Sequence, residues 1–308
     1  SGVGGCTRVN ALINLYPDHN DWNNLAAYLD DQSWSPSSMY QLYQGMQKGN
    51  GGWLNLSQAN PTTLAKDTML VKMLAASLAM DAVKTPWSLG SFFDEAFRTV
   101  TGAEIELAKK LWIEKANIGL NPNHPGYALL EKKFNGVFNI PFNATDGVRK
   151  GVREHILNAE QKYSDKLFIK TESLCTRVLF DENNKTKAIG IEFMEGAHAY
   201  KADVLNADKA KSSYVKKTAF AAKEVILAGG AFSTPQLMML SGIGPAEELR
   251  RMNIPVVLNK PGVGRNLQDR YEVTVVSELN QPLSIIKDCT FAKNNDFESD
   301  PCWQEYQK

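Results

Sequence analysis

The chain contains 308 residues, 43% of them hydrophobic, which is enough to bury the core of one large domain or of two smaller ones. Its 34 basic side chains balance its 34 acidic ones, so no net charge predicts a nucleic-acid or membrane-surface partner. The longest apolar stretch, residues 69–80, includes Lys72 and is too short to cross a bilayer. We therefore expect a globular protein without a membrane span.

Cysteines and glycosylation sequons bear on the compartment of the protein. The four cysteines are Cys6, Cys175, Cys289 and Cys302, and they lack the paired spacing of a zinc site, so no metal site is predicted. Cys289 and Cys302 either form a disulfide or belong to a set of reduced thiols. Sequons at Asn55, Asn143 and Asn184 favour a secreted or extracellular location, although such triplets also arise by chance.

The first part of the chain is a glycine-rich loop followed by helices. Glycine occupies positions 2, 4 and 5, and an apolar run follows Asn10. Residues 21–47 have helical periodicity, and their aromatic side chains are expected in the core: Trp22, Tyr28, Trp34, Tyr40 and Tyr43. After a polar glycine loop at residues 48–52, further helices are predicted at 61–82 and 89–117.

The middle of the chain moves from helices to short β-branched runs. A turn cluster at residues 121–126 precedes a candidate strand within 128–142, and residues 146–158 predict a capped helix. Residues 166–173 and 175–196 predict a β-meander with a turn at 181–185.

A glycine-rich stretch near residue 230 is the most informative part of the sequence. A loop at residues 200–218 leads to EVILA at 224–228, which predicts a continuous apolar strand. Gly229 and Gly230 end this strand. A helix follows, with Ser233 and Thr234 at its cap and Pro235 in its first turn.

Two more glycine turns follow this helix. They lie at residues 242–244 and 262–264, with a short helix and a strand between them. A helix N-terminus after a buried strand offers free N–H groups and a positive dipole to an anionic ligand such as a dinucleotide. The same pattern also arises where a helix packs tightly on a sheet, so the pattern alone leaves both interpretations open.

Longer motifs resemble one known family. Residues 229–244, GGAFSTPQLMMLSGIG, resemble the second signature of the glucose/methanol/choline (GMC) family of FAD-dependent oxidoreductases, and the segment PGVGRNLQD after it resembles that family's VGxNLQD turn. Residues 4–13, GGCTRVNALI, resemble the first signature, a loop that lies along the flavin. The resemblance extends from Gly4 to Ser277. We call residues 4–13 the N-terminal glycine loop and residues 229–244 the second glycine segment.

The resemblance implies a set of FAD contacts. Gly4, Gly5 and Cys6 would let the backbone approach the flavin, Asn10 would offer its amide, and Ala11 and Ile13 would line the same loop. Cys175 would contact the adenine through its backbone, and Ala228, Gly229 and Gly230 would lie near the ribose and pyrophosphate. Some relatives attach FAD through a His before the signature Asn. That position is Val9 here, so we expect non-covalent FAD.

Other family features are not found in the sequence. The ADP-binding strand, GxGxxG turn and helix are missing, and no His stands in the family's catalytic context, so no catalytic residue is assigned to His19, His124, His155 or His198. The expected function is therefore FAD-dependent oxidation of an alcohol or sugar hydroxyl by hydride transfer in a complete enzyme, with this chain inactive alone. The alternative is a non-catalytic structural or interaction protein on a GMC-derived fold.

The resemblance also implies an incomplete α/β fold and a division into domains. The FAD-binding domain would comprise residues 1–20 and 159–265, and the substrate domain, a helical region and the start of an antiparallel sheet, residues 21–158 and 266–308. Expected partners are a small-molecule alcohol or sugar, and either the missing terminal segments or further copies of the protein. No nucleic-acid or membrane partner is predicted.

Overall fold

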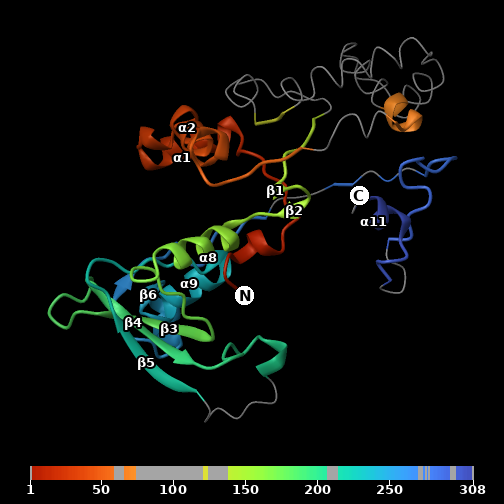
Figure 1. The fold of residues 1–308 in the computed structure, drawn as a ribbon. Helices are drawn as coiled ribbons and strands as arrows, with labels where there is room; N and C mark the ends of the chain where they lie inside the picture. The colour runs from red at the N-terminus through yellow and green to blue at the C-terminus, as the bar shows by residue number, and fades with distance from the viewer. Residues whose placement is uncertain are drawn as a thin grey trace. The chain divides into compact units, whose positions relative to one another are not determined.

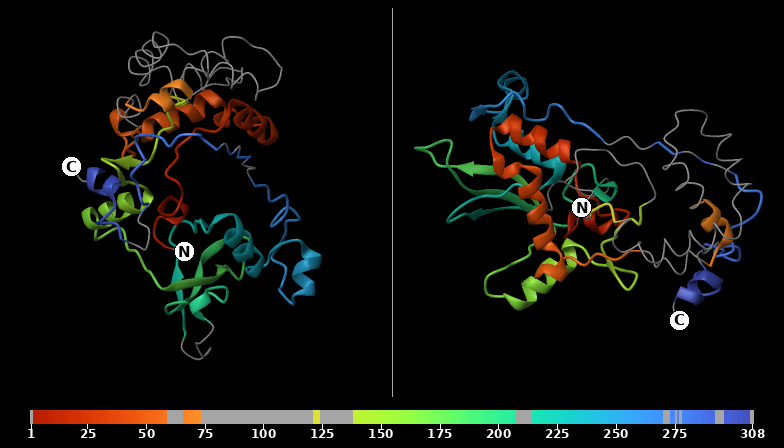
Figure 2. Two further views of the ribbon diagram at one scale, coloured as in Figure 1. Left: turned by 90° about the vertical axis from the view of Figure 1, so that its right-hand side faces the viewer. Right: turned by 90° about the horizontal axis from the view of Figure 1, so that it is seen from above.

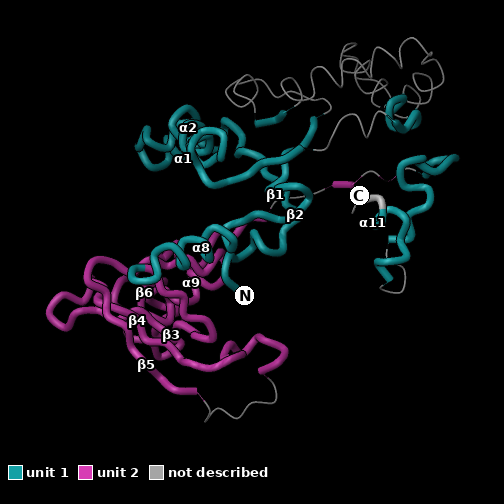
Figure 3. The backbone as a smooth tube through the Cα atoms, in the orientation of Figure 1, with its two compact units in different colours: residues 1–166, 277–308 teal, residues 167–276 magenta. Residues whose placement is uncertain are grey.

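The computed structural model describes residues 2–58, 66–73, 121–123, 138–206, 214–269, 273–274, 276, 278–291 and 296–306. The chain divides into two compact units, shown in Figure 3: Ser1–Lys166 with Ser277–Lys308, and Leu167–Val276. The predicted division into an FAD domain and a substrate domain stays a prediction. The helices predicted at 61–82 and 89–117 lie outside the described residues, except that 68–73 are helical.

Unit 1 is mainly helical. Its elements are the 3-10 helices η1 (Gly5–Arg8), η2 (Gln32–Trp34) and η3 (Lys48–Asn50), the helices α1 (His19–Leu29), α2 (Pro36–Met46), α8 (Val152–Lys162) and α11 (Pro301–Tyr306), and the hairpin β1 (Ala144–Thr145) and β2 (Val148–Arg149). Asp18 starts α1 because its carboxylate accepts a hydrogen bond from Asn20 N at 2.8 Å. Pro36 starts α2 at its first turn.

The helices α1 and α2 lie side by side (Figure 1), and an aromatic cluster joins them. The Tyr16 ring lies 5.7 Å from that of Tyr40 and 4.6 Å from that of Tyr43, and the Trp22 ring lies 6.2 Å from Tyr43. Burial raises the pKa of Tyr16 to about 12. The predicted core position is thus confirmed for Tyr40, which is 8% exposed, while Trp22 and Tyr43 are half-buried. The prediction was wrong for Tyr28, which is 87% exposed, and for Trp34, which is 37% exposed.

The helix predicted over residues 146–158 starts later than expected. Residues 144–149 form the β1–β2 hairpin instead, with Gly147 at its turn in a left-handed conformation (φ 72°). The helix α8 then begins at Val152, where Glu154 accepts a hydrogen bond from Gly151 N at 2.8 Å. The hairpin turn at Gly147 therefore keeps residues 146–149 out of the helix, although their sequence pattern predicted one.

A buried carboxylate attaches residues 284–285 to the rest of unit 1. Asp67 is 1% exposed, and it accepts hydrogen bonds from Met69 N, Leu70 N, Ser284 Oγ and Ile285 N at 2.9 to 3.1 Å. Burial alone would raise the pKa of this carboxyl, but these donors hold it below its ordinary value.

Farther along, Cys289 and Cys302 form a disulfide, which was one of the two alternatives left open by the sequence.

Replacing Asp67 by Asn should destabilise the protein by about 2 kcal/mol at pH 7, because an amide turns N–H groups toward donors that need an acceptor. The folded-state pKa of Asp67 is depressed, so its stabilisation is present above the unfolded value near 3.8 and is lost as the pH falls through the folded value. Urea unfolding at pH 7 and pH 3 should therefore show a difference between wild type and variant that shrinks at pH 3. Asp31→Asn, at an exposed turn, should change little at either pH.

Unit 2 is an antiparallel sheet with helices. The strands β3 (Ser173–Phe180), β4 (Ala188–Glu195) and β5 (Val215–Phe220) pair in the order β3-β4-β5, and η4 (Val204–Asn206), α9 (Gly230–Leu240), β6 (Ile243–Gly244), α10 (Ala246–Arg251) and β7 (Leu258–Asn259) complete the unit. Figures 1 and 2 show the three strands side by side with α9 next to β3. The predicted pair of strands around the turn 181–185 is confirmed as β3 and β4, but residues 166–172, predicted as part of the meander, form no strand. The strand β5 lies partly inside the predicted loop 200–218, because its residues pair with β4.

The predicted strand at residues 224–228 does not form. These residues pair with no strand in the described part of the chain, and Ile226 is 76% exposed. A parallel strand needs neighbours on its edges to satisfy its backbone groups. The apolar pattern is that of a central strand, and such neighbours are lacking among the described residues. The helix α9 was also misplaced: it begins at Gly230, so Pro235 lies inside it rather than at its first turn.

Candidate functional site

The N-terminal glycine loop is shaped by two left-handed glycines. Gly4 has φ 93° and Gly5 has φ 56°, a region that side chains disfavour. A Cβ on Gly4 would lie 2.6 Å from Arg153 Cβ, so Gly4 is required for the packing of this loop on α8. A Cβ on Gly5 would meet nothing within 4 Å. Of the two, Gly5 is therefore the position where a ligand can approach the backbone.

Arg149, at the end of β2, holds the loop in place. Its Nη1 donates to Thr7 O at 2.9 Å and to Asn10 Oδ1 at 2.8 Å, and its Nη2 donates to Asn10 O at 2.8 Å. Asn10 Oδ1 also accepts a hydrogen bond from Leu12 N at 3.1 Å. The carboxamide of Asn10 is therefore fixed through its oxygen. No acceptor among the described residues contacts its Nδ2, which remains available to a ligand.

The outward face of the loop is exposed and largely apolar. Cys6 and Ala11 are exposed, Ile13 is half-exposed, and Val9 is 80% exposed. Exposed apolar residues that lie this close together along one loop indicate a surface that a ligand or another chain segment can cover. Sequence reasoning assigned Gly4, Gly5, Cys6, Asn10, Ala11 and Ile13 to a cofactor, and the structure brings these residues together on one loop, with Gly4 explained by packing.

Unit 2 contains the other predicted residues. Cys175 lies on β3 directly before a β-bulge, since Cys175 pairs with Phe193 and Arg177 pairs with Glu192, which leaves Thr176 as the extra residue. Burial raises the pKa of the Cys175 thiol. Because β3 is an edge strand of its sheet, its outer backbone groups have no neighbouring strand within the described residues. This is compatible with the predicted backbone contact at Cys175.

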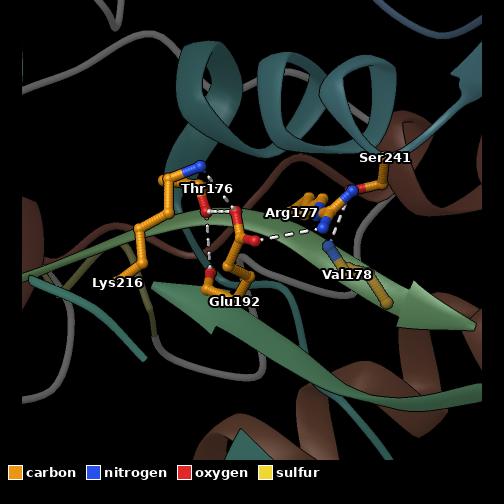
Figure 4. A network of polar contacts seen from close by, with 6 residues as sticks. All are labelled: Thr176, Arg177, Val178, Glu192, Lys216 and Ser241. Atoms are coloured by element: carbon orange, nitrogen blue, oxygen red, sulfur yellow. Dashed lines mark hydrogen bonds and ion pairs between the residues drawn. The ribbon is translucent and has the colours of Figure 1, made fainter. Parts of the chain in front are cut away.

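A polar network fixes the bulge (Figure 4). Thr176 Oγ1 donates to Glu192 Oε1 at 2.8 Å, and Arg177 Nη2 lies 3.0 Å from Glu192 Oε2. Lys216 of β5 lies 4.0 Å from the same carboxylate. The hydrogen bond from Thr176 and the nearby Arg177 and Lys216 charges lower the pKa of Glu192. One carboxylate therefore connects all three strands next to Cys175.

Ser241, at the end of the second glycine segment, joins α9 to β3. Its Oγ accepts a hydrogen bond from Val178 N at 2.8 Å (Figure 4). The same Oγ donates to Leu237 O at 2.6 Å. Both Ser241 and Val178 are buried. The Ser of the motif SGIG is thus a structural residue that satisfies an edge-strand N–H group, a role that the motif alone did not reveal.

Replacing Ser241 by Ala should cost about 1 to 3 kcal/mol of stability, because the buried Val178 N–H then has no acceptor. Urea unfolding at neutral pH measures this loss. Ser173→Ala is the matched control, since its exposed hydroxyl donates only to Thr171 O at 3.0 Å, and it should stay within about 0.5 kcal/mol of wild type. Equal effects of the two substitutions would contradict the assignment.

The start of α9 is open to a ligand. Gly229 N donates to Thr234 Oγ1 at 2.9 Å, so this residue predicted for the cap does satisfy a helix-end group. Gly230 has φ 89°, and a Cβ there would meet nothing within 4 Å. Ala228, Gly229 and Gly230 are all exposed. They lie together at this helix end, and Cys175 lies in the same unit.

Three of the histidines, His19, His155 and His198, lie in the described part of the chain, and their side chains have different environments. His19 is the first residue of α1 and has a buried Nδ1 without a hydrogen-bond partner. His155 on α8 stacks on Trp53 with ring centroids 4.4 Å apart. His198 Nδ1 lies 2.9 Å from Asp203 Oδ2. His124 lies outside the described residues.

Two further kinds of feature are absent from the described residues, a metal-binding cluster and a membrane-spanning helix. No three His, Cys, Asp or Glu side chains are grouped so that they could hold a metal ion. None of the helices in this part of the chain has the length and apolar character that a bilayer crossing requires.

Comparison with known proteins identifies this combination of features. The family model described as GMC oxidoreductase matches residues 1–272. Human mitochondrial choline dehydrogenase is 40% identical over 114 residues, which are 37% of this chain and 16% of that protein. The oxygen-dependent choline dehydrogenase of Burkholderia thailandensis is 39% identical over 119 residues, or 39% of this chain and 18% of that protein. The aligned region is thus a small part of each relative.

Solved structures agree in fold. An FAD-dependent oxidoreductase from Chaetomium thermophilum superposes with a TM-score of 0.52 at 24% identity, covering 87% of this chain and 39% of that one. A formate oxidase from Aspergillus oryzae gives a TM-score of 0.54 at 17% identity, covering 85% and 37%. At these identities the likeness concerns the fold.

The family match over most of the chain and the α/β fold place the chain among the FAD-dependent flavoprotein oxidoreductases. It belongs to the GMC oxidoreductase family. Each unit has one predicted glycine whose backbone is open and left-handed, Gly5 beside Asn10 in unit 1 and Gly230 at the start of α9 in unit 2, and both are compatible with the predicted approach of FAD.

Proposed function

We propose that the complete protein oxidises a hydroxyl group of a small alcohol or sugar, with non-covalent FAD as the electron acceptor. The observation that carries this proposal is the loop fixed by Arg149, on which Gly5 is exposed and Asn10, which is half-buried, has an Nδ2 without an acceptor among the described residues. The choline dehydrogenases among the relatives support an alcohol as the substrate class.

Each predicted residue except Gly4 would help to hold the cofactor. Gly5 and Cys6 would give the flavin access to the backbone, Asn10 would donate through Nδ2, and Ala11 and Ile13 would provide an apolar contact. The backbone at Cys175 would contact the adenine, and Ala228, Gly229 and Gly230 would hold the ribose and pyrophosphate at the N-terminus of α9. When bound, FAD supplies an acceptor for the hydride that leaves the alcohol carbon.

Residues 1–308 alone should not oxidise an alcohol. Removing the hydroxyl proton requires a base within hydrogen-bond reach of the substrate. His155 stacks on Trp53, His198 bonds to Asp203, and His19 starts α1, so none of the described histidines lies on the N-terminal glycine loop or in the second glycine segment. We therefore propose that the base comes from another part of the complete protein.

The test is a visible absorption spectrum of the full-length protein before and after denaturing precipitation, followed by anaerobic addition of choline and other alcohols. Flavin bands that move to the supernatant, and that bleach with an alcohol before denaturation, are expected. Absence of flavin in the full-length protein would refute the proposal and favour a non-catalytic protein on the same fold. Flavin that stays with the precipitate would refute only the non-covalent attachment of FAD and would leave the proposed oxidation standing.

A further inference from the structure

Two of the three sequons have side chains that are hydrogen-bonded within the packed part of unit 1. Asn143 is 8% exposed, its Oδ1 accepts a hydrogen bond from Asn14 Nδ2 at 2.9 Å, and its backbone N donates to Leu12 O at 2.9 Å. Because the side chain is buried, an oligosaccharide on its Nδ2 would have to displace the residues packed around it. Asn143 is therefore a structural residue beside the N-terminal glycine loop.

The second sequon is also engaged in packing. Asn55 is half-buried, and its Nδ2 donates to Thr145 Oγ1, which is the hydroxyl of the Asn143 sequon. The two sequons thus bond to each other through atoms that glycosylation needs. Neither presents a free acceptor amide at the surface.

The third sequon has the opposite environment. Asn184 lies in the exposed turn between β3 and β4, and Asp181 Oδ1 orders this turn by accepting hydrogen bonds from Asn183 N at 2.8 Å and Asn184 N at 3.1 Å. Thr186 Oγ1 donates to Asn184 Oδ1 at 2.9 Å. Nδ2 of Asn184, the atom that a glycan occupies, has no acceptor among the described residues. A large polar substituent can extend from this turn into solvent.

A second observation concerns the compartment. Cys289 and Cys302 form a disulfide with Cα atoms 5.2 Å apart. Disulfides form and persist in the secretory pathway and outside the cell, and they are rare in the cytosol. The secretory pathway is also where oligosaccharide is transferred to the Asn of a sequon.

From these observations we propose that the protein matures in the secretory pathway and carries one N-linked glycan, at Asn184. In this transfer, Asn184 Nδ2 forms a bond to the anomeric carbon of a lipid-linked oligosaccharyl diphosphate. The bond from that carbon to the phosphate oxygen breaks, the diphosphate leaves, and the amide loses one proton. Asn55 and Asn143 stay unmodified because their side chains are part of the packing of unit 1.

The first test uses native full-length protein digested with peptide N-glycosidase in ¹⁸O-labelled water and mapped by mass spectrometry. Labelled Asp is expected at position 184, with unmodified Asn at 55 and 143 and a linked Cys289–Cys302 peptide. Unmodified Asn184 in the native protein, or labelled Asp at 143, would overturn the proposal. The result does not depend on flavin binding, so it is separable from the proposed function.

The second test uses full-length protein secreted from eukaryotic cells. Asn184→Gln and Thr186→Ala should each abolish the mobility shift caused by the glycosidase. Asn183→Gln is the matched control, because it changes the neighbouring amide in the same turn and leaves the sequon intact, so it should keep the shift. A shift that persists in Asn184→Gln would refute the site.

Discussion

Replacing Arg149 by Ala should weaken FAD binding to the full-length protein by about 30-fold. The substitution removes three hydrogen bonds from the guanidinium to Thr7 O, Asn10 O and Asn10 Oδ1, which together fix the N-terminal glycine loop. A 30-fold loss corresponds to about 2 kcal/mol, within the range for charge-assisted hydrogen bonds. The measurement is FAD titration of the apoprotein by quenching of flavin fluorescence.

The controls separate a role in the loop from loss of a charge. Arg153→Ala removes a nearby arginine on α8, whose guanidinium lies 3.6 Å from Glu154, and it should leave FAD affinity within about 3-fold of wild type. Arg149→Lys keeps the charge but cannot make the forked contact, so it should restore only part of the affinity. Limited proteolysis of the apoprotein should cut the loop faster in Arg149→Ala. Equal affinities for the two alanine variants would contradict the assignment.

Replacing Gly242 by Ala should destabilise the protein by about 3 kcal/mol or more. Gly242 has φ 87°, and an added Cβ would lie 2.5 Å from Pro255 O and 2.8 Å from Val257 Cγ2. Both the left-handed backbone and the steric clash oppose the substitution. The clash would separate β6 from β7, since Gly242 O accepts hydrogen bonds from Val257 N at 2.8 Å and Leu258 N at 3.1 Å.

A second glycine of the same region provides the matched control. Gly262 has no left-handed φ, and a Cβ there would meet nothing within 4 Å, so Gly262→Ala should change stability by less than about 0.5 kcal/mol. Urea unfolding of both variants measures the difference. If Gly242→Ala is expressed only as insoluble protein while Gly262→Ala is soluble, the prediction is also met. Equal stability of the two variants would show that the turn relaxes at little cost.

The sequence by itself determined the family and the cofactor. Residues 4–13 and 229–244 are two long motifs that follow each other in the order found in the family. Several of their glycines have a left-handed backbone that few other residues adopt, so the two motifs together are specific. Local patterns also predicted the aromatic cluster of α1 and α2 and the β3–β4 hairpin, because caps, turns and alternation act over a few residues.

Only the tertiary structure decided what depends on residues distant in sequence. Arg149 is 139 residues from Asn10 and Ser241 is 63 residues from Val178, so no local pattern could show that these pairs bond. The strand expected at residues 224–228 did not form, because a ladder of hydrogen bonds needs a neighbouring strand whatever the apolar pattern. Likewise, the sequence did not distinguish the three sequons, but the structure exposes Asn184 and packs Asn55 and Asn143 into unit 1, because burial is a property of the packed fold.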